Sequence, residues 1–193
     1  MKTKITQNLL FSGVSLQNSK ITLDPWFVTG LVDGDGGVGV SIRRNFKSLL
    51  GYAIGLTFEV GLDRKDEDLL KGLQAYFGVG GVYSSSGNML RYKVSSIQDI
   101  IRVILPHFAK YPLVTQKRAD FELLRCVIDI LNSGPLSPEG LKKIVAIKAT
   151  LNRGLTPELR ASFPEIIPVE RPTITCSESL QPMWVCRLNS SGR

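Results

Sequence analysis

The segment from Pro25 to Asn45 constrains the fold most, because it predicts a helix that ends in two acids and turns directly into a strand. Asp24 suits the N-cap position and Pro25 the first helical position. Apolar and small residues follow, and Asp33 and Asp35 fall at the C-terminal end of the predicted helix. A run of glycines comes next, and we expect it to supply a left-handed C-cap.

The residues after the glycine run alternate in character, which predicts a strand. One face is apolar, with Val38, Val40 and Ile42. The other face is small, polar or basic, with Gly39, Ser41, Arg43 and Asn45. Together with the preceding helix, this places two carboxylates at the start of a strand that has one face free for polar contacts.

Acids at the C-terminal end of a helix are unfavourable, because the helix macrodipole is negative there. A divalent cation such as Mg²⁺ would offset this cost, since carboxylate oxygens are its preferred ligands. The same local pattern also fits an ordinary Asp-Gly turn between a core helix and a strand. The pattern by itself leaves both interpretations open.

The rest of the chain predicts an α+β domain. Strands are expected at 52–62, 81–85 and 89–95, and helices at 65–77, 97–108, 116–131, 138–151 and 157–163. The order helix–strand–strand–helix–strand–strand–helix predicts a four-stranded antiparallel sheet with helices on one face, followed by additional C-terminal helices. We expect residues 1–20 to form a flexible polar arm, 21–163 the domain, and 164–193 an irregular linker-like tail.

The charge of the chain suggests an acidic partner. Its 193 residues carry a formal net charge of +7, which favours nucleic acid, although a solvated basic face is the alternative. A two-stranded ribbon fits the major groove of DNA, where Arg, Lys, Asn and Ser reach base edges. The single histidine, His107, excludes catalytic histidine pairs and is expected to be structural. No apolar run approaches the roughly 20 residues that span a membrane.

The segment Val28 to Gly36, VTGLVDGDG, resembles the LAGLIDADG motif of homing endonucleases. The resemblance extends from Leu23 to Arg171 and includes the segments SIRRN, FGVG, HFAKYPLVTQK and GLKKIVAIKATLNRGLTPEL. These are typical of the first half of two-motif enzymes from fungal mitochondrial introns. The resemblance implies the αββαββα fold of that family, with a saddle-shaped sheet that binds DNA, and location in the mitochondrion.

The resemblance also implies roles for individual residues. Asp35 and Gly36 would bind Mg²⁺ or another divalent cation, and Lys117 would lie near the catalytic site, with Asp33 in a supporting role. The interface with a second half would use Trp26, Phe27, Gly30, Leu31 and Gly34. The DNA-facing positions of the sheet would be Gly39, Ser41, Arg43, Asn45, Ala53, Gly55, Thr57, Glu59, Gly61, Arg91 and Lys93.

One departure from the family pattern matters for function, because a two-motif enzyme has a second copy of the motif. The stretch 181–186, QPMWVC, parallels DPWFVT at 24–29, but Arg187 stands where the motif glycine belongs and no acid follows. Truncation or a frameshift in a two-motif enzyme would explain this. We therefore expect a homodimer or a complementary half-domain as partner. The alternatives are a non-cleaving RNA maturase or DNA-binding remnant, with intron RNA as a possible partner, and a decayed half-protein.

Overall fold

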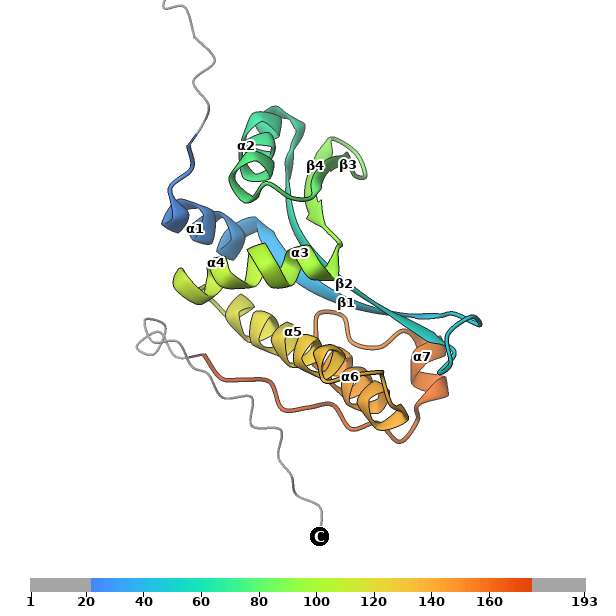
Figure 1. Cartoon of the computed structure of the whole chain (residues 1–193). Helices are drawn as coiled ribbons and strands as arrows, with labels where there is room; N and C mark the ends of the chain where they lie inside the picture. The colour runs from blue at the N-terminus through green and yellow to red at the C-terminus, as the bar shows by residue number, and fades with distance from the viewer. Residues whose placement is uncertain (1–21, 175–193) are drawn as a thin grey trace, which may run out of the picture.

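The computed structural model describes residues 22–174 and confirms the predicted α+β architecture. One four-stranded antiparallel sheet, in the order β1-β2-β4-β3, carries the helices on one side (Figure 1). The arm predicted at 1–20 and the motif-like stretch at 181–186 lie outside the described residues. None of the helices within 22–174 is long and apolar enough to cross a membrane.

The first six elements follow the predicted order closely. Their bounds are α1 Pro25–Asp35, β1 Gly36–Arg44, β2 Tyr52–Asp63, α2 Glu67–Phe77, β3 Gly81–Ser84 and β4 Met89–Val94. A 3₁₀ turn, Arg64–Asp66, precedes α2. The glycine after α2, Gly78, takes the left-handed conformation with φ 69°, which a residue without Cβ adopts without strain.

The helix predicted at 97–108 is interrupted by a π segment. The chain forms α3 (Ile97–Asp99), a π-helical stretch (Ile100–Ile104) and α4 (Leu105–Lys110) in succession. Within it, the Leu105 amide bonds to the Ile100 carbonyl, five residues back rather than four. Pro106 gives the reason, because a proline ring collides with the carbonyl four residues earlier in a regular α-helix. The wider π turn accommodates this ring within the helix.

Three further helices complete the described part of the chain: α5 Lys117–Asn132, α6 Pro138–Thr150 and α7 Pro157–Ser162. Side-chain hydroxyl groups cap the N-termini of α6 and α7, as the Ser-Pro-Glu and Thr-Pro-Glu sequences predict. Ser137 accepts the Gly140 amide at 3.0 Å, and Thr156 accepts the Leu159 amide at 3.3 Å. Residues 164–174 have no regular secondary structure and run back along α5 and α6 (Figure 1).

Aromatic rings form the centre of the core between the sheet and the helices. The ring of Phe58, on β2, lies 5.8–6.2 Å from the rings of Phe77, Tyr92, Phe108 and Phe121. The inward positions of the three longer strands are buried; they are Val38, Val40, Leu56, Phe58, Val60, Leu90, Tyr92 and Val94. This packing fixes which face of the sheet is turned away from the helices and is open to a partner.

Candidate functional site

The C-terminal end of α1 leads into β1 without a loop. Gly36 has extended backbone angles (φ −96°, ψ 176°), so the predicted left-handed C-cap is wrong. Its amide still donates to the Val32 carbonyl, and a Cβ at Gly36 would lie 2.8 Å from the Val32 side chain. Glycine is therefore needed here for close approach to the last helical turn, and the strand starts immediately beside the two acids.

The two acids of α1 have different surroundings. The Asp33 carboxylate accepts the Val114 amide at 2.9 Å, the Thr115 amide at 3.3 Å and the Thr115 hydroxyl at 2.6 Å. Asp35 is exposed, and among residues 22–174 its carboxylate has no hydrogen bond or ion pair. Residues two positions apart on a helix point about 200° apart, which separates the two groups. Asp33 thus ties α1 to the segment before α5, while Asp35 stays free for a ligand.

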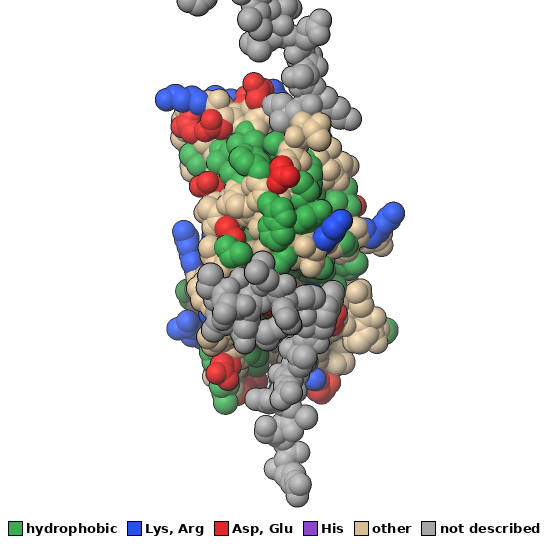
Figure 2. Space-filling view, turned by 90° about the vertical axis from the view of Figure 1, so that its left-hand side faces the viewer, with side chains coloured by type: hydrophobic (Ala, Val, Ile, Leu, Met, Phe, Trp, Pro, Cys, Tyr) green, Lys and Arg blue, Asp and Glu red, His purple; other side chains and the backbone are tan. Residues whose placement is uncertain are grey.

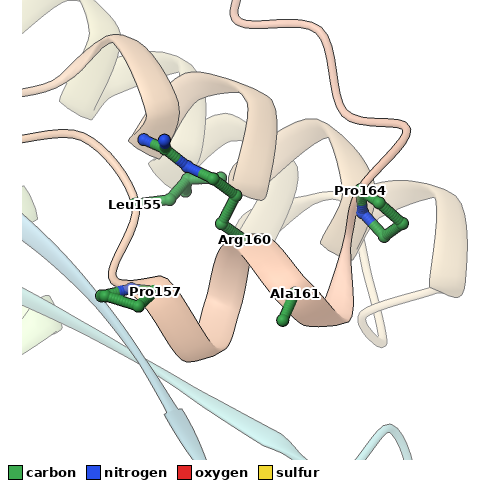
Figure 3. Close-up of a pocket in the computed structure, with 5 residues that line it drawn as sticks. All are labelled: Leu155, Pro157, Arg160, Ala161 and Pro164. Atoms are coloured by element: carbon green, nitrogen blue, oxygen red, sulfur yellow. The ribbon is translucent and has the colours of Figure 1, made fainter.

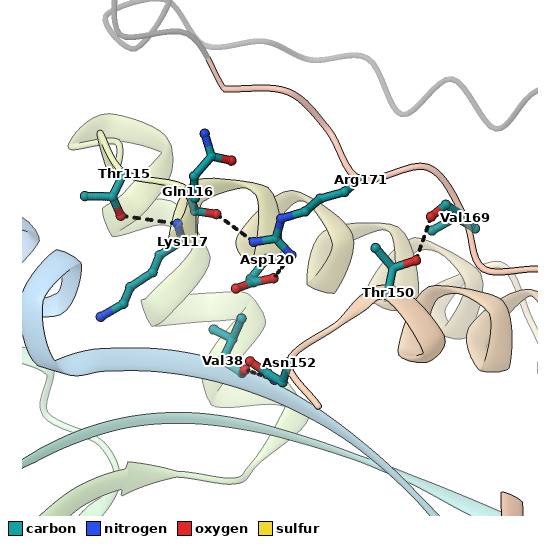
Figure 4. Close-up of polar contacts among 9 residues, drawn as sticks. All are labelled: Val38, Thr115, Gln116, Lys117, Asp120, Thr150, Asn152, Val169 and Arg171. Atoms are coloured by element: carbon teal, nitrogen blue, oxygen red, sulfur yellow. Dashed lines mark hydrogen bonds and ion pairs between the residues drawn. The ribbon is translucent and has the colours of Figure 1, made fainter. Parts of the chain in front are cut away.

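Lys117, the first residue of α5, reaches the end of α1. Its ammonium donates to the carbonyls of Val32 at 3.3 Å and Gly34 at 2.5 Å, and its own amide donates to the Thr115 hydroxyl at 3.2 Å (Figure 4). A cation at this position offsets the negative end of the helix macrodipole. Sequence reasoning singled out the YPLVTQK segment but missed Thr115, which links Asp33 to Lys117.

A divalent cation fits the end of α1 in part. The free carboxylate of Asp35 and the adjoining backbone of Gly36 supply oxygen atoms at a negative helix end, as a hard cation prefers. Within residues 22–174, however, no group of three or more His, Cys, Asp or Glu side chains could hold a metal ion. One copy of this region therefore offers a partial site, and further oxygen ligands have to come from a partner, a substrate or water.

The outward side of α1 is apolar and flat. Trp26 and Phe27 are each 49% exposed, and Leu31 is half-buried. Gly30 and Gly34 are exposed, and a Cβ added at either would meet nothing within 4 Å. Figure 2 views the molecule from the side on which α1 lies and shows hydrophobic side chains gathered in its upper half. The five predicted interface residues thus share a surface that another helix could approach closely.

The polar face of the sheet brings three predicted contact residues together. Arg91 on β4 forms an ion pair with Glu59 on β2 at 2.7 Å, and Lys93 is paired with Glu59 in the strand register. A hollow of about 410 Å³ opens beside them; its lining residues are Glu59, Tyr83, Ser84, Ser85, Arg91, Lys93 and Ser95. Arg43 is exposed further along β1. The sequence did not single out Tyr83, which is 59% exposed at this hollow.

Two hydroxyl groups on this face of the sheet donate hydrogen bonds to backbone carbonyls of the neighbouring strand. Ser41 donates to the Gly55 carbonyl at 3.3 Å, and Thr57 donates to the Gly39 carbonyl at 3.5 Å. A Cβ at Gly55 or Gly39 would come within 2.8 Å of one of these hydroxyl oxygens. Glycine opposite each hydroxyl therefore leaves room for these side chains to lie against the backbone of β1 and β2.

Asn45 does not belong to the polar strand face, where the alternating pattern placed it. β1 ends at Arg44, and Asn45 closes the turn to β2: its amide donates to the Gly51 carbonyl at 2.8 Å, and its side-chain oxygen accepts the Lys47 amide at 3.1 Å. Asparagine side chains commonly form such turns by bonding to the backbone two residues on. This local turn overrides the period-two pattern at its last position.

Two other features lie outside this arrangement. His107 is structural: burial lowers its pKa to about 4, the Tyr76 hydroxyl lies 3.2 Å from its Nδ1, and the rings of Phe77 and Phe108 pack around it. An open depression of about 560 Å³ beside α7 is lined by Leu155, Pro157, Arg160, Ala161 and Pro164 (Figure 3). It contains no acid and none of the residues at the end of α1.

The family model for the LAGLIDADG endonuclease matches residues 28–128 of this chain. The match begins inside α1 and ends within α5, so it covers the whole sheet, both acids of α1 and Lys117. It does not reach α6, α7 or residues 164–174.

Relatives in fungi match over most of this chain. Probable intron-encoded endonuclease 3 of Neurospora crassa is 38% identical over 175 residues, 89% of this chain and 33% of its own length. Probable intron-encoded endonuclease 2 of the same fungus is 36% identical over 152 residues, 77% of this chain and 34% of its own. This chain thus spans about a third of the length of these curated relatives.

Solved structures agree with the fold. The homing endonuclease I-SmaMI bound to cleaved DNA superposes with a TM-score of 0.77 at 37% identity, over 80% of this chain and 52% of that one. I-CpaMI bound to uncleaved DNA gives 0.74 at 38% identity, over 80% and 53%. The present chain therefore corresponds to about half of each solved enzyme.

Proposed function

The chain belongs to the LAGLIDADG endonuclease family, and from this we propose that it is one half of a DNA endonuclease that depends on a divalent metal ion. It would bind a long duplex target through the polar face of its sheet. Cleavage would take place where the end of its α1 meets the equivalent helix of a partner. The homing endonucleases I-SmaMI and I-CpaMI, which share its fold, have been solved with DNA bound.

The observation that carries this proposal is the difference between the two acids at the end of α1. The Asp33 carboxylate accepts hydrogen bonds from the segment before α5. The Asp35 carboxylate is exposed and has no hydrogen bond or ion pair among residues 22–174. An unpaired acid at a negative helix end is costly unless a cation binds there. The Lys117 ammonium donates to the Gly34 carbonyl at the same helix end and contributes a positive charge there. A site of this kind suits chemistry in which negative charge develops.

Each residue at this end would have a distinct task in the reaction. Asp35, with the backbone of Gly36, would hold Mg²⁺ or another divalent cation; a bound ion lowers the pKa of its water and stabilises the leaving oxygen. Lys117 would stabilise negative charge on the phosphate as it forms, because its ammonium is already oriented. Asp33 would keep α1 and the start of α5 in register. One solved form of I-SmaMI holds its uncleaved target in the presence of calcium ions, in keeping with a divalent ion in this role.

Cutting both DNA strands needs two displacements, and residues 22–174 bring one free motif acid. We propose that the outward side of α1 pairs with a second copy of the chain or with a complementary half-domain. The apolar and glycine positions on that side support pairing, because they allow two helices to approach closely. Pairing would place two Asp35 carboxylates, or Asp35 and a partner acid, at one junction.

Replacing Gly30 with Leu tests this pairing. A Cβ added at Gly30 meets no atom within 4 Å in the single chain and Gly30 is exposed, so the fold should be retained while the partner helix is blocked. We expect light scattering at tens of micromolar, roughly the range in which a specific interface holds, to show a dimer for the wild type and a monomer for Gly30→Leu. A wild-type monomer under these conditions would exclude the homodimer, and the complementary half would remain.

The function itself is tested with a random library of DNA duplexes. Duplexes that the purified chain retains in calcium are amplified, sequenced and offered again in magnesium. We expect cleavage at one position of the enriched sequence. Tight binding without any cleavage would contradict the nuclease proposal for the chain by itself and favour a DNA-binding remnant. No binding to any duplex would contradict the proposal as a whole.

Two further points remain proposals. Location in the mitochondrion agrees with relatives that are named intron-encoded and come from fungi, one of them described as a protein in ND4 intron 1 of Podospora anserina. Binding to intron RNA would accompany the maturase alternative.

A further inference from the structure

The position of the Lys117 ammonium depends on the first turn of α5. Lys117 is the first residue of this helix, and Gln116 is its N-cap. The Gln116 side chain makes no capping hydrogen bond, and side chains from other segments contact this turn in addition to its local backbone bonds, in which the Arg118 amide donates to Thr115 and the Ala119 amide to Gln116. On one side, Thr115 connects it to Asp33. Contacts on the other side of the turn therefore bear on the orientation of Lys117.

Arg171 holds that other side. Its Nη1 lies 2.7 Å from the Asp120 carboxylate, and its Nη2 donates to the Gln116 carbonyl at 2.9 Å (Figure 4). The guanidinium thus joins an acid in the first turn of α5 to the carbonyl that precedes Lys117. Arg171 is 36% exposed and Asp120 only 16%, so the pair is partly shielded from water. A rigid guanidinium fork fixes two acceptors at once, which an ammonium cannot do.

The segment that carries Arg171 is itself fastened to α6. The Val169 amide donates to the Ala146 carbonyl at 3.3 Å, and the Thr150 hydroxyl donates to the Val169 carbonyl at 2.6 Å. Beyond Arg171, the Gln116 side chain donates to the Ile174 carbonyl at 3.3 Å. Gln116 is thus contacted twice by residues that follow it by more than fifty positions. This segment lies beyond residues 28–128, which the family model covers.

We propose that Arg171 is a positioning residue for Lys117, and that residues 164–174 therefore support catalysis rather than only continuing the chain. This rests on the proposed function, in which Lys117 stabilises charge during DNA cleavage. Arg171 does not touch the reacting groups. It acts through Gln116 and Asp120, so its loss should loosen the first turn of α5 and free the Lys117 ammonium from the α1 carbonyls.

The experiment compares wild type with Arg171→Ala and Arg171→Lys, and uses Lys142→Ala as the matched control. Lys142, exposed on α6, forms a 3.7 Å ion pair with Glu165, which is exposed near the start of the same segment. Trace acetylation with acetic anhydride, followed by mass spectrometry, measures the reactivity of each lysine. Lys148, half-buried on α6, and Lys93, on the sheet, report general loosening of the fold.

We expect Arg171→Ala to raise the acetylation rate of Lys117 by about threefold or more, with Lys148 and Lys93 unchanged. In Arg171→Lys, the acetylation rate of Lys117 should lie between those of the wild type and Arg171→Ala, because lysine keeps the charge but lacks the guanidinium fork. The control should match wild type. In single-turnover cleavage of the enriched duplex, Arg171→Ala should lower the rate constant about tenfold, with the DNA dissociation constant unchanged.

Unchanged Lys117 reactivity in both Arg171 variants would overturn the proposal, and so would an equal rise at Lys117, Lys148 and Lys93. If Arg171→Ala does not fold, Arg171→Lys decides. If the wild type cleaves no DNA, the proposed function fails, but the acetylation pattern still decides whether Arg171 positions Lys117. A loss of DNA affinity as large as the loss of rate would place Arg171 in binding and contradict the assigned role.

Discussion

The end of α1 and the polar face of the sheet are built in opposite ways. At the end of α1, Asp33 and Lys117 are held by five hydrogen bonds to groups distant in sequence. On the sheet face, the side chains of Arg43 and Lys93 have no hydrogen bond or ion pair among residues 22–174. The cationic side chain at the end of α1 is thus held in one orientation, whereas those on the sheet face are free to change theirs.

This difference matches two different tasks. Stabilising a transition state needs groups that are oriented before the reaction, because reorganisation during the reaction costs rate. Reading a duplex needs long side chains that adjust to phosphates and base edges. The comparison predicts that changes at the end of α1 affect cleavage far more than binding, while changes on the sheet face do the reverse.

The largest effect is expected for Asp35→Asn. The amide keeps the shape of the side chain but lacks the charge that a divalent ion needs, so cleavage should fall by about a thousandfold or more, while binding in calcium stays within a few-fold. Asp33→Asn is the control: it should lower the melting temperature, because an amide group cannot accept all three bonds from Val114 and Thr115. Cleavage rates are measured at saturating enzyme. Cleavage that survives Asp35→Asn would refute the assigned role.

Lys117→Ala should have the next largest effect. Removing an oriented cation from the site should slow cleavage about a hundredfold and leave the DNA dissociation constant nearly unchanged. Lys117→Arg is informative beside it, because the larger guanidinium cannot make the same contacts with the Val32 and Gly34 carbonyls. Single-turnover rates and binding isotherms separate the two quantities. An equal loss of cleavage rate and DNA affinity would show that Lys117 acts as a phosphate contact instead. The end of α1 would then not be specialised for cleavage over binding.

The fold could be predicted well from the sequence, because local signals decide it. Apolar alternation fixed the inward faces of the strands, and the Ser-Pro-Glu and Thr-Pro-Glu sequences marked the starts of α6 and α7. The errors arose where a contact distant in sequence or a special backbone pattern decides. The glycine run predicts a left-handed C-cap, but Gly36 is extended and is required for close packing on Val32. The π stretch before Pro106 and the turn at Asn45 similarly departed from simple periodicity.

The candidate site could be predicted only in part. The motif placed Asp35, and the resemblance placed Lys117 nearby, but no local pattern shows that Thr115 joins Asp33 to Lys117 or that Arg171 fastens Gln116. The contact of Thr115 with Asp33 joins residues 82 positions apart, and the contact of Arg171 with Gln116 joins residues 55 positions apart. Residues 164–174 belong to the stretch that the sequence predicts as an irregular tail, and they carry the Arg171 contact. Periodicity describes single elements, and it says nothing about which element ends meet.

On the sheet face, Arg43 and Lys93 should matter more for binding than Arg91. Each free cation that contacts a phosphate releases counterions, so Arg43→Ala and Lys93→Ala should each lower the slope of log affinity against log salt by about one. Arg91 is already paired with Glu59 at 2.7 Å, so Arg91→Ala should change the slope less. The variant Glu59→Gln should free Arg91 and raise affinity at low salt. Equal slopes for all three alanine variants would mean that the ion pair opens when DNA binds.

The smallest effects are expected for the two hydroxyl groups of the sheet face. Ser41 and Thr57 already donate to the carbonyls of Gly55 and Gly39, so a new bond to DNA would replace an existing one and bring little net gain. Ser41→Ala and Thr57→Val should each change the DNA dissociation constant by about twofold or less, with no change in salt slope. The measurement is a titration of the enriched duplex at fixed salt, with Arg43→Ala run in parallel. A loss of about tenfold for either hydroxyl variant would show that the side chain turns away from the strand and reads a base. The uncharged polar side chains of the sheet face would then reorient on DNA binding, as its cationic side chains do.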